Sequence, residues 1–270
     1  MLVKLKEIVR HRQLIQTLVS RELKARYRGT VLGFLWSFFN PLLLMLVYSI
    51  VFGFIMPARF PQFEEKAIYY SIFLFTGILP WTWFSSSLNE SANVLLVHGA
   101  LIKKIHFPIE VLPIMVVVTN MIHFLLGIPI LILFFLIFFP AAISWWVLFL
   151  PLAVFVQAIF TMGLSFLISA LTVHFRDIKD ILANLLTLWF FSTPIIYPFD
   201  APQIQNSTAL KTLLSLNPMT HIVEAYHFAF FYGSLPHYKR LSMTVLVGAL
   251  FFYLGFKIFD KLRDTFIEEV

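Results

Sequence analysis

The strongest constraint in this sequence is a run of 65 residues, Val111 to Phe175, that contains no Asp, Glu, Lys or Arg. About 20 apolar residues in a helix cross the hydrocarbon core of a bilayer. The run is therefore long enough for two membrane-spanning helices, and we expect the turn between them at Phe139-Pro140-Ala141-Ala142. Hydrophobic residues make up 60% of the chain and charged residues only 13%, more apolar surface than a soluble domain of this length could bury.

Four further runs lack acidic and basic residues, namely 29–58, 67–89, 181–199 and 241–256. They are continuously apolar rather than alternating, which favours helices. We expect six transmembrane helices at about 32–56, 68–89, 111–139, 145–172, 180–197 and 241–260. The expected fold class is an all-α integral membrane protein, with an amphipathic interface segment at 1–30 and one six-helix domain at 31–270. The first apolar run starts only after about 30 residues of charged sequence, so we expect a retained span and not a signal peptide.

The distribution of Lys and Arg predicts the orientation. Cytoplasmic segments of membrane proteins carry an excess of these residues. With the N-terminus on the cytoplasmic side, the segments on that side hold 15 of them and the opposite side holds 5. We therefore expect both termini in the cytoplasm.

Residues 8 to 28 have the pattern of an amphipathic helix that lies along the membrane surface. The apolar face is formed by Leu14, Ile15, Leu18 and Val19. The basic face is formed by Arg21, Lys24 and Arg28, which would lie among anionic headgroups. The alternative is that these charges only orient the first span.

The segment 98–113, between the second and third expected spans, combines four large apolar residues with two lysines. The apolar residues are Leu101, Ile102, Ile105 and Phe107. Lys103 and Lys104 lie among them, and Pro108 and Pro113 end any helix there. A short amphipathic piece of this kind suits docking into a groove on a soluble partner. The alternative is that it rests on the bilayer surface.

Two short apolar stretches at about 208–216 and 219–232 bracket Asn217-Pro218, in the outer segment 200–238. Together they could enter the membrane and return, which is tolerated where protein buries the turn. They could equally form an extracellular helical hairpin. Both alternatives place Asn217, Glu224, Tyr226 and His227 near an outer mouth.

Several kinds of chemistry have no motif in this sequence. With no cysteine, a Cys-ligated metal site and a Cys nucleophile are excluded, and we expect no metal site and no catalytic residues. There is no G-x-x-x-x-G-K-[ST], so the chain does not bind ATP through a P-loop. We expect His123 to bond a neighbouring helix rather than to relay protons, and Gly163, Ser165 and Ser169 to mark close helix packing.

Aromatic residues divide into two groups. Trp81, Trp83, Trp145 and Trp146 lie near span ends, as in an interfacial belt. A second group lies within the first and fifth expected spans, namely Trp36, Phe39, Tyr48, Phe52, Trp189 and Tyr197. Rings of this kind could line a conduit and stack weakly on sugars, or they could face lipid.

The order of these motifs resembles that of the ABC-2-type polysaccharide and polyol-phosphate export permeases. The pieces that carry the resemblance are 20–27, 32–36, 40–42, Pro80-Trp81, 101–108, 112–113, Phe175-Arg176-Asp177-Ile178, Ser192-Thr193-Pro194-Ile195-Ile196-Tyr197 and Leu216-Asn217-Pro218. Each piece is weak alone, but they follow the family's order over nearly the whole chain.

The resemblance implies a permease of an ATP-driven exporter in the bacterial inner membrane, not an enzyme. The permease would be a homodimer with two separate cytoplasmic ATPase subunits, which would bind ATP and Mg, and this chain would hold no cofactor and no nucleic acid. Its substrate would be an undecaprenyl-type lipid-linked polysaccharide. A lining without fixed charge favours O-antigen, and teichoic acid or capsule remains an alternative.

The resemblance also assigns segments. Residues Leu101 to Pro108, including His106, would be the coupling helix seated in the ATPase. Residues 200–232 would form the outer gate, with Asn217, Pro218, Glu224 and Tyr226. Two alternatives from other classes are an ion-coupled carrier and an intramembrane enzyme that acts on a lipid-linked sugar. The enzyme would need Glu90, Glu224 and His227 to converge on one pocket.

Overall fold

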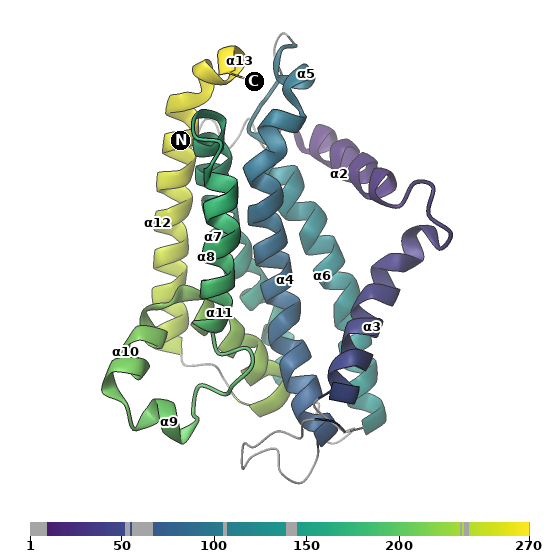
Figure 1. Cartoon of the computed structure of the whole chain (residues 1–270), viewed down its shortest axis with the longest axis vertical. Helices are drawn as coiled ribbons and strands as arrows, with labels where there is room; N and C mark the ends of the chain where they lie inside the picture. The colour runs from purple at the N-terminus through teal and green to yellow at the C-terminus, as the bar shows by residue number, and fades with distance from the viewer. Residues whose placement is uncertain are drawn as a thin grey trace.

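A computed structural model describes residues 10–51, 55, 67–104, 107–138, 145–232, 234 and 238–269. Every regular element in these ranges is helical, which confirms the expected all-α class (Figure 1). The expected turn at 139–142 and the conduit residue Phe52 lie outside the described residues.

The elements follow in chain order. They are α2 (Arg12–Arg26), η1 (Gly33–Leu35), α3 (Trp36–Ile50), α4 (Ala67–Val97), α5 (Gly99–Ile102), α6 (Val111–Phe138), η5 (Trp145–Phe149), α7 (Leu150–His174), α8 (Ile178–Phe191), α9 (Pro202–Gln205), α10 (Thr208–Leu216), α11 (Pro218–His227), η6 (Phe228–Tyr232), α12 (Tyr238–Leu262), η7 (Arg263–Thr265) and α13 (Phe266–Glu269).

Four helical stretches in the described ranges are long and apolar enough to cross a membrane. They are Gly33–Ile50, Val111–Phe138, Trp145–His174 and Arg240–Glu269. The expected span at 68–89 lies within α4, a helix of 31 residues that occupies the middle of the bundle (Figure 1). The six-span count is therefore not confirmed, and four candidate spans stand.

The largest difference concerns the expected span at 180–197. Helix α8 has 14 residues and ends at Phe191. At about 1.5 Å per residue it covers only about 21 Å, less than the hydrocarbon core of a bilayer. Pro194 follows closely, and a proline provides no N–H for continued helix and disfavours helical backbone in the residue before it.

The hydrophobic core lies around α4, which packs against α3, α6, α7, α8 and α11. Trp83, Phe84 and Leu88 are almost fully buried in it. Two contacts fix the neighbours of α4 in register. The indole nitrogen of Trp83 donates to the carbonyl of Val117 at 3.1 Å, and Gln157 on α7 donates to the carbonyl of Pro80 at 2.7 Å.

Helices α7 and α12 touch through glycine. A Cβ atom on Gly255 would lie 2.0 Å from the carbonyl oxygen of Gly163, and one on Gly163 would lie 2.4 Å from the backbone nitrogen of Phe252. The two backbones thus approach as closely as small residues permit in membrane helices. This confirms the packing role predicted for Gly163.

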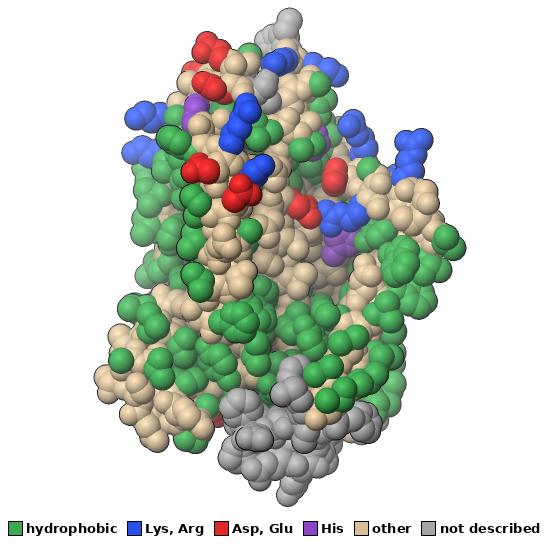
Figure 2. Space-filling view, in the orientation of Figure 1, with side chains coloured by type: hydrophobic (Ala, Val, Ile, Leu, Met, Phe, Trp, Pro, Cys, Tyr) green, Lys and Arg blue, Asp and Glu red, His purple; other side chains and the backbone are tan. Residues whose placement is uncertain are grey.

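The described residues at the two ends of the bundle differ in charge. In the view of Figure 2, most of the visible Lys, Arg, Asp and Glu side chains gather toward the end where α5 and α13 lie, and hydrophobic side chains are widespread over the described surface of the opposite half. At the charged end, Arg263 pairs with Glu110 at 2.9 Å, which ties the C-terminal turn to the start of α6.

Candidate functional sites

Helix α2 has the two faces that the sequence predicts. Leu18 and Val19 are buried against the core that includes α6, and Leu14 and Ile15 pack beside them. The opposite face is solvent-exposed and carries Arg21 and Lys24, so α2 attaches to the bundle by one stripe of apolar side chains.

The predicted helix at 8–28 is too long at its C-terminal end. Helix α2 ends at Arg26, and Arg28 lies in the following turn, beside Gly29 with φ of 77°. A positive φ suits glycine and ends a helix. Arg28 therefore does not share a helical face with Arg21 and Lys24, although it is exposed like them.

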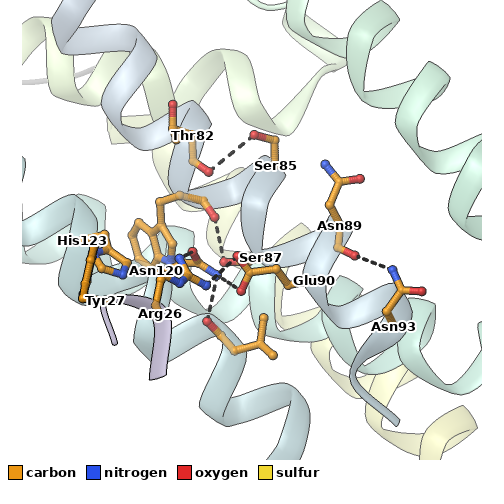
Figure 3. Close-up of polar contacts among 12 residues, drawn as sticks. Arg26, Tyr27, Thr82, Ser85, Ser87, Asn89, Glu90, Asn93, Asn120 and His123 are labelled. Carbon is orange, nitrogen blue, oxygen red and sulfur yellow. Dashed lines mark hydrogen bonds and ion pairs between the residues drawn. The ribbon is translucent and has the colours of Figure 1, made fainter. Parts of the chain in front are cut away.

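A polar cluster joins the end of α2 to α4 and α6 (Figure 3). Nη2 of Arg26 donates to Oε1 of Glu90 at 2.8 Å, and Nδ2 of Asn120 donates to Oε2 of Glu90 at 2.9 Å. Nη1 of Arg26 also reaches Oδ1 of Asn120 at 3.5 Å. This cluster was not predicted from the sequence. The sequence feature that could have pointed to it is Glu90, which is the lone charged residue in 67–102.

Tyr27 lies beside this cluster and contacts α6. Its hydroxyl is 3.3 Å from Nδ1 of His123, and the two rings meet edge to face. His123 thus has a polar partner, as predicted, but the partner follows the interface helix instead of lying on another span. The other ring nitrogen of His123, Nε2, is buried without a hydrogen-bond partner among the described residues.

A cavity of about 660 Å³ opens where α2, α3, α4 and α6 meet. Arg26, Tyr27, Asn120 and His123 line it on the polar side. The remaining wall combines aromatic rings with amide, hydroxyl and aliphatic groups, supplied by Thr30, Trp36, Ser37, Asn40, Pro41, Leu44, Leu79, Thr82, Trp83, Ser86 and Phe124. The site therefore offers ring faces and hydrogen-bonding groups side by side.

The residues predicted to line a conduit do not meet in one lining among the described residues. Trp36 lines the cavity above, whereas Phe39 is 41% exposed on α3 and the Tyr48 side chain is half-buried. Trp189 packs edge-on against Phe84 and is held by a hydrogen bond. Tyr197 donates its hydroxyl to the carbonyl of Phe191 at 2.8 Å.

In the described part of the predicted coupling segment, the regular structure is the end of one short helix. Helix α5 has 4 residues, and Lys103 and Lys104 beyond it are exposed. Ile102 was predicted to take part in docking, but it is 2% exposed in the core that also contains Phe266 of α13. Leu101, Phe107 and Pro108 are half-buried, and Ile105 and His106 lie outside the described residues.

Asn217 connects the end of α8 to the start of α11. Its Oδ1 accepts from the indole nitrogen of Trp189 at 2.8 Å and from the backbone nitrogen of Met219 at 3.0 Å. Its Nδ2 donates to the carbonyl of Ser192 and to the hydroxyl of Thr193, both at 2.9 Å. Pro218 occupies the first turn of α11, where a missing N–H costs nothing.

The other residues predicted at the outer gate separate. Tyr226 is buried and donates to Oε1 of Gln157 at 2.9 Å. Glu224 lies near Arg240, at 3.8 Å, and lines a second cavity of about 420 Å³ together with His227. Glu224 and Tyr226 thus take different surroundings, one at a cavity and one in the core.

The carboxylate and histidine constellation required by the enzyme alternative does not form. Glu224 and His227 share the second cavity, whereas Glu90 belongs to the cluster at the end of α2. Within the described ranges, no group of three or more His, Asp and Glu could hold a metal ion.

Comparison with known proteins gives a consistent result. A family model described as ABC-2 type transporter matches residues 13–231. The O-antigen export system permease protein RfbA of Myxococcus xanthus is 38% identical over 265 residues, which cover 98% of both chains. RfbA of Klebsiella pneumoniae is 32% identical over 256 residues, 94% of each chain. The polysialic acid transport protein KpsM of Escherichia coli is 23% identical over 257 residues, 94% of this chain and 95% of KpsM.

Proposed function

The chain belongs to the ABC-2 type transporter family, and from this premise we propose that it is the permease subunit of an ATP-driven exporter of lipid-linked O-antigen polysaccharide. The observation that carries the proposal is the 38% identity, over 98% of both chains, to an O-antigen export permease. Capsule export is the weaker candidate, because the relatives named for polysialic acid are 22–23% identical.

Energy comes from another chain in this proposal. The sequence has no P-loop, so separate cytoplasmic subunits bind and hydrolyse ATP. The segment 101–108 docks into them. Two observations support this assignment: Lys103 and Lys104 are exposed, and α5 lies at the charged end of the bundle (Figure 2). Ile102 serves as the internal anchor of the segment.

The coupling role predicts that Phe107→Asp weakens ATPase binding. A carboxylate at position 107 would have to lose its water in the apolar groove of the ATPase, which is costly. We expect much less ATPase to co-purify with the variant in detergent, and export to fall with it. Val97→Asp, at a position that is 73% exposed just before α5, is the matched control and should retain the ATPase. Equal co-purification of both variants would contradict the docking assignment.

The permease acts as a homodimer in the bacterial inner membrane, with both termini cytoplasmic and α4 and α8 completing six membrane-embedded helices. Exposed apolar faces on α3 and α8 support a second copy. On α8 the exposed side chains are Ile181, Leu185, Leu188 and Phe191. A 14-residue helix of this kind is best accommodated where another protein chain shields its ends.

The function is tested by complementation. A strain that lacks its own O-antigen permease receives this chain together with its ATPase, and surface polymer is measured by immunoblotting of intact cells. We expect surface polymer to be restored, and a partner ATPase without its P-loop lysine to leave lipid-linked polymer inside. Surface polymer that is independent of this chain would overturn the proposal.

A further inference from the structure

Residues 263–266 form a turn that folds back onto the end of the bundle, and we call it the clamp turn. Helix α12 ends at Leu262, η7 follows, and α13 begins at Phe266. In a continuous helix Phe259 and Phe266, seven positions apart, would be separated by about 10.5 Å along the axis. Their ring centroids lie 5.2 Å apart instead, edge to face. The break in the helix therefore directs Phe266 back into the bundle.

Phe266 anchors the first flank of the segment 101–108. Its side chain is fully buried, in the same core cluster as Ile102. Ile102 is the last residue of α5, where the segment leaves the helix. Helices α13 and α5 are in contact and lie at the same end of the bundle (Figure 1). Removal of the Phe266 ring would leave a cavity beside Ile102.

Arg263 holds the second flank of the same segment. Its Nη1 lies 2.9 Å from Oε1 of Glu110, whose side chain is almost fully buried. Glu110 directly precedes α6, and a carboxylate at a helix N-terminus is favourable. Its neighbour Ile109 is also buried. Loss of Arg263 would leave a buried carboxylate without its counter-charge, which is strongly unfavourable.

A third contact fixes the clamp turn to the end of α7. The hydroxyl of Thr265 donates its single proton to the carbonyl of Leu262 at 2.7 Å. It therefore accepts from Nε2 of His174, the last residue of α7, at 3.2 Å. Helix α7 is itself packed closely against α12 through Gly163 and Gly255. The clamp turn is thus supported by two helices that hold each other.

Between the two anchored flanks, the segment presents charged side chains to solvent. Lys103 and Lys104 are exposed, whereas Ile102 before them and Ile109 after them are buried. A partner that binds an ordered segment avoids the entropy cost of ordering it. Anchored flanks therefore favour binding even though the anchoring residues lie behind the docking surface.

We propose that the clamp turn positions the docking segment for the ATPase. Phe266 acts through Ile102 and Arg263 acts through Glu110, so both are positioning residues that do not touch the ATPase. The proposal rests on the proposed function, in which the segment 101–108 docks into the ATPase. It adds that the end of α12 sets the shape of that segment.

The first test measures hydrogen exchange of the permease alone in nanodiscs. Amides of Ile102 and Lys103 are bonded to the carbonyls of His98 and Gly99, so their exchange reports local opening. We expect Arg263→Glu and Phe266→Ala to accelerate exchange in peptides that cover 99–112, by about tenfold. Peptides from α10, at the opposite end of the bundle, should exchange at the unmodified rate, which excludes global unfolding (Figure 1).

The second test measures the affinity of the purified ATPase for the permease in nanodiscs. Arg263→Glu should weaken binding by about tenfold, the equivalent of ordering one or two side chains. The charge swap of Arg263→Glu with Glu110→Arg re-forms the ion pair and should restore most of the affinity. A role in general stability predicts no such rescue.

Two neighbouring substitutions are the matched controls. Lys261→Glu makes the same charge change at an exposed position, and Ile267→Ala shortens a side chain that is 52% exposed next to Phe266. Both should behave like the unmodified chain in exchange and in binding.

Three results would overturn the proposal. Unmodified exchange over 99–112 in both clamp variants would refute the anchoring, and a charge swap that binds no better than Arg263→Glu alone would refute the positioning role. Neither result would affect the proposed function. An unmodified chain that binds no ATPase would instead refute the docking assignment, and the positioning role with it.

Discussion

The ion pair between Arg26 and Glu90 holds the C-terminal end of α2 to α4, and a double-mutant cycle can measure its strength. Their side chains are 30% and 35% exposed, so solvent screens much of the attraction. We expect Arg26→Gln and Glu90→Gln each to lower the free energy of unfolding, with a coupling below about 1 kcal/mol. Arg21→Gln, on the exposed face of the same helix, is the control and should change little. Additive effects of the two substitutions would show that the pair contributes nothing.

Substitutions at Asn217 can separate its two roles, which are to cap α11 and to hold the end of α8. Asn217→Asp keeps an oxygen that can cap α11 but loses the amide that donates to Ser192 and Thr193. Asn217→Ala loses both. We expect alanine to cost about 1–2 kcal/mol of unfolding free energy and aspartate less. Thermal unfolding in detergent gives the order, and an equal loss in both variants would show that capping is irrelevant here.

At this scale the sequence predicted residue types better than partners. It predicted a bonded His123, because an isolated polar residue in an apolar run needs a partner. It assigned Asn217 to an outer gate and did not predict that this residue joins α8 to α11. It could not predict that Arg26 meets Glu90, because 64 residues separate them and their contact depends on how α2 docks. The cavity where α2, α3, α4 and α6 meet was missed for the same reason, since its wall comes from these four helices.

At the scale of elements, the close crossing of α7 and α12 is the most sensitive packing contact that the glycines reveal. In Gly255→Ala the new Cβ would lie 2.0 Å from the carbonyl oxygen of Gly163, which is backbone and cannot rotate away. We expect a loss of about 1–3 kcal/mol as the helices separate. Gly248→Ala, on the same helix with its nearest contact at 3.5 Å, is the matched control and should be nearly neutral. Equal melting temperatures for the two variants would contradict this account.

Helix positions followed from the sequence where apolar runs are long. The expected spans at 111–139, 145–172 and 241–260 correspond to α6, α7 and α12 within a few residues. The expected helix at 180–197 was wrong at its C-terminal end for two reasons. Pro194 stops the backbone ladder, and Asn217 takes the Ser192 carbonyl that a continued helix would have used. The first reason was readable from the sequence, whereas the second depends on tertiary contact.

For the whole molecule, the orientation in the membrane is the prediction with the cleanest test, because the chain contains no cysteine. The excess of Lys and Arg predicts that the end with α5 faces the cytoplasm and the end with α10 faces outside. Single cysteines at Lys103 and Lys211, both exposed, report on the two ends. In intact spheroplasts a membrane-impermeant maleimide should label Lys211→Cys and spare Lys103→Cys until the membrane is opened. The unmodified chain should remain unlabelled throughout. Labelling of Lys103→Cys in intact spheroplasts would reverse the orientation and, with it, remove the ATPase docking segment from the cytoplasmic side.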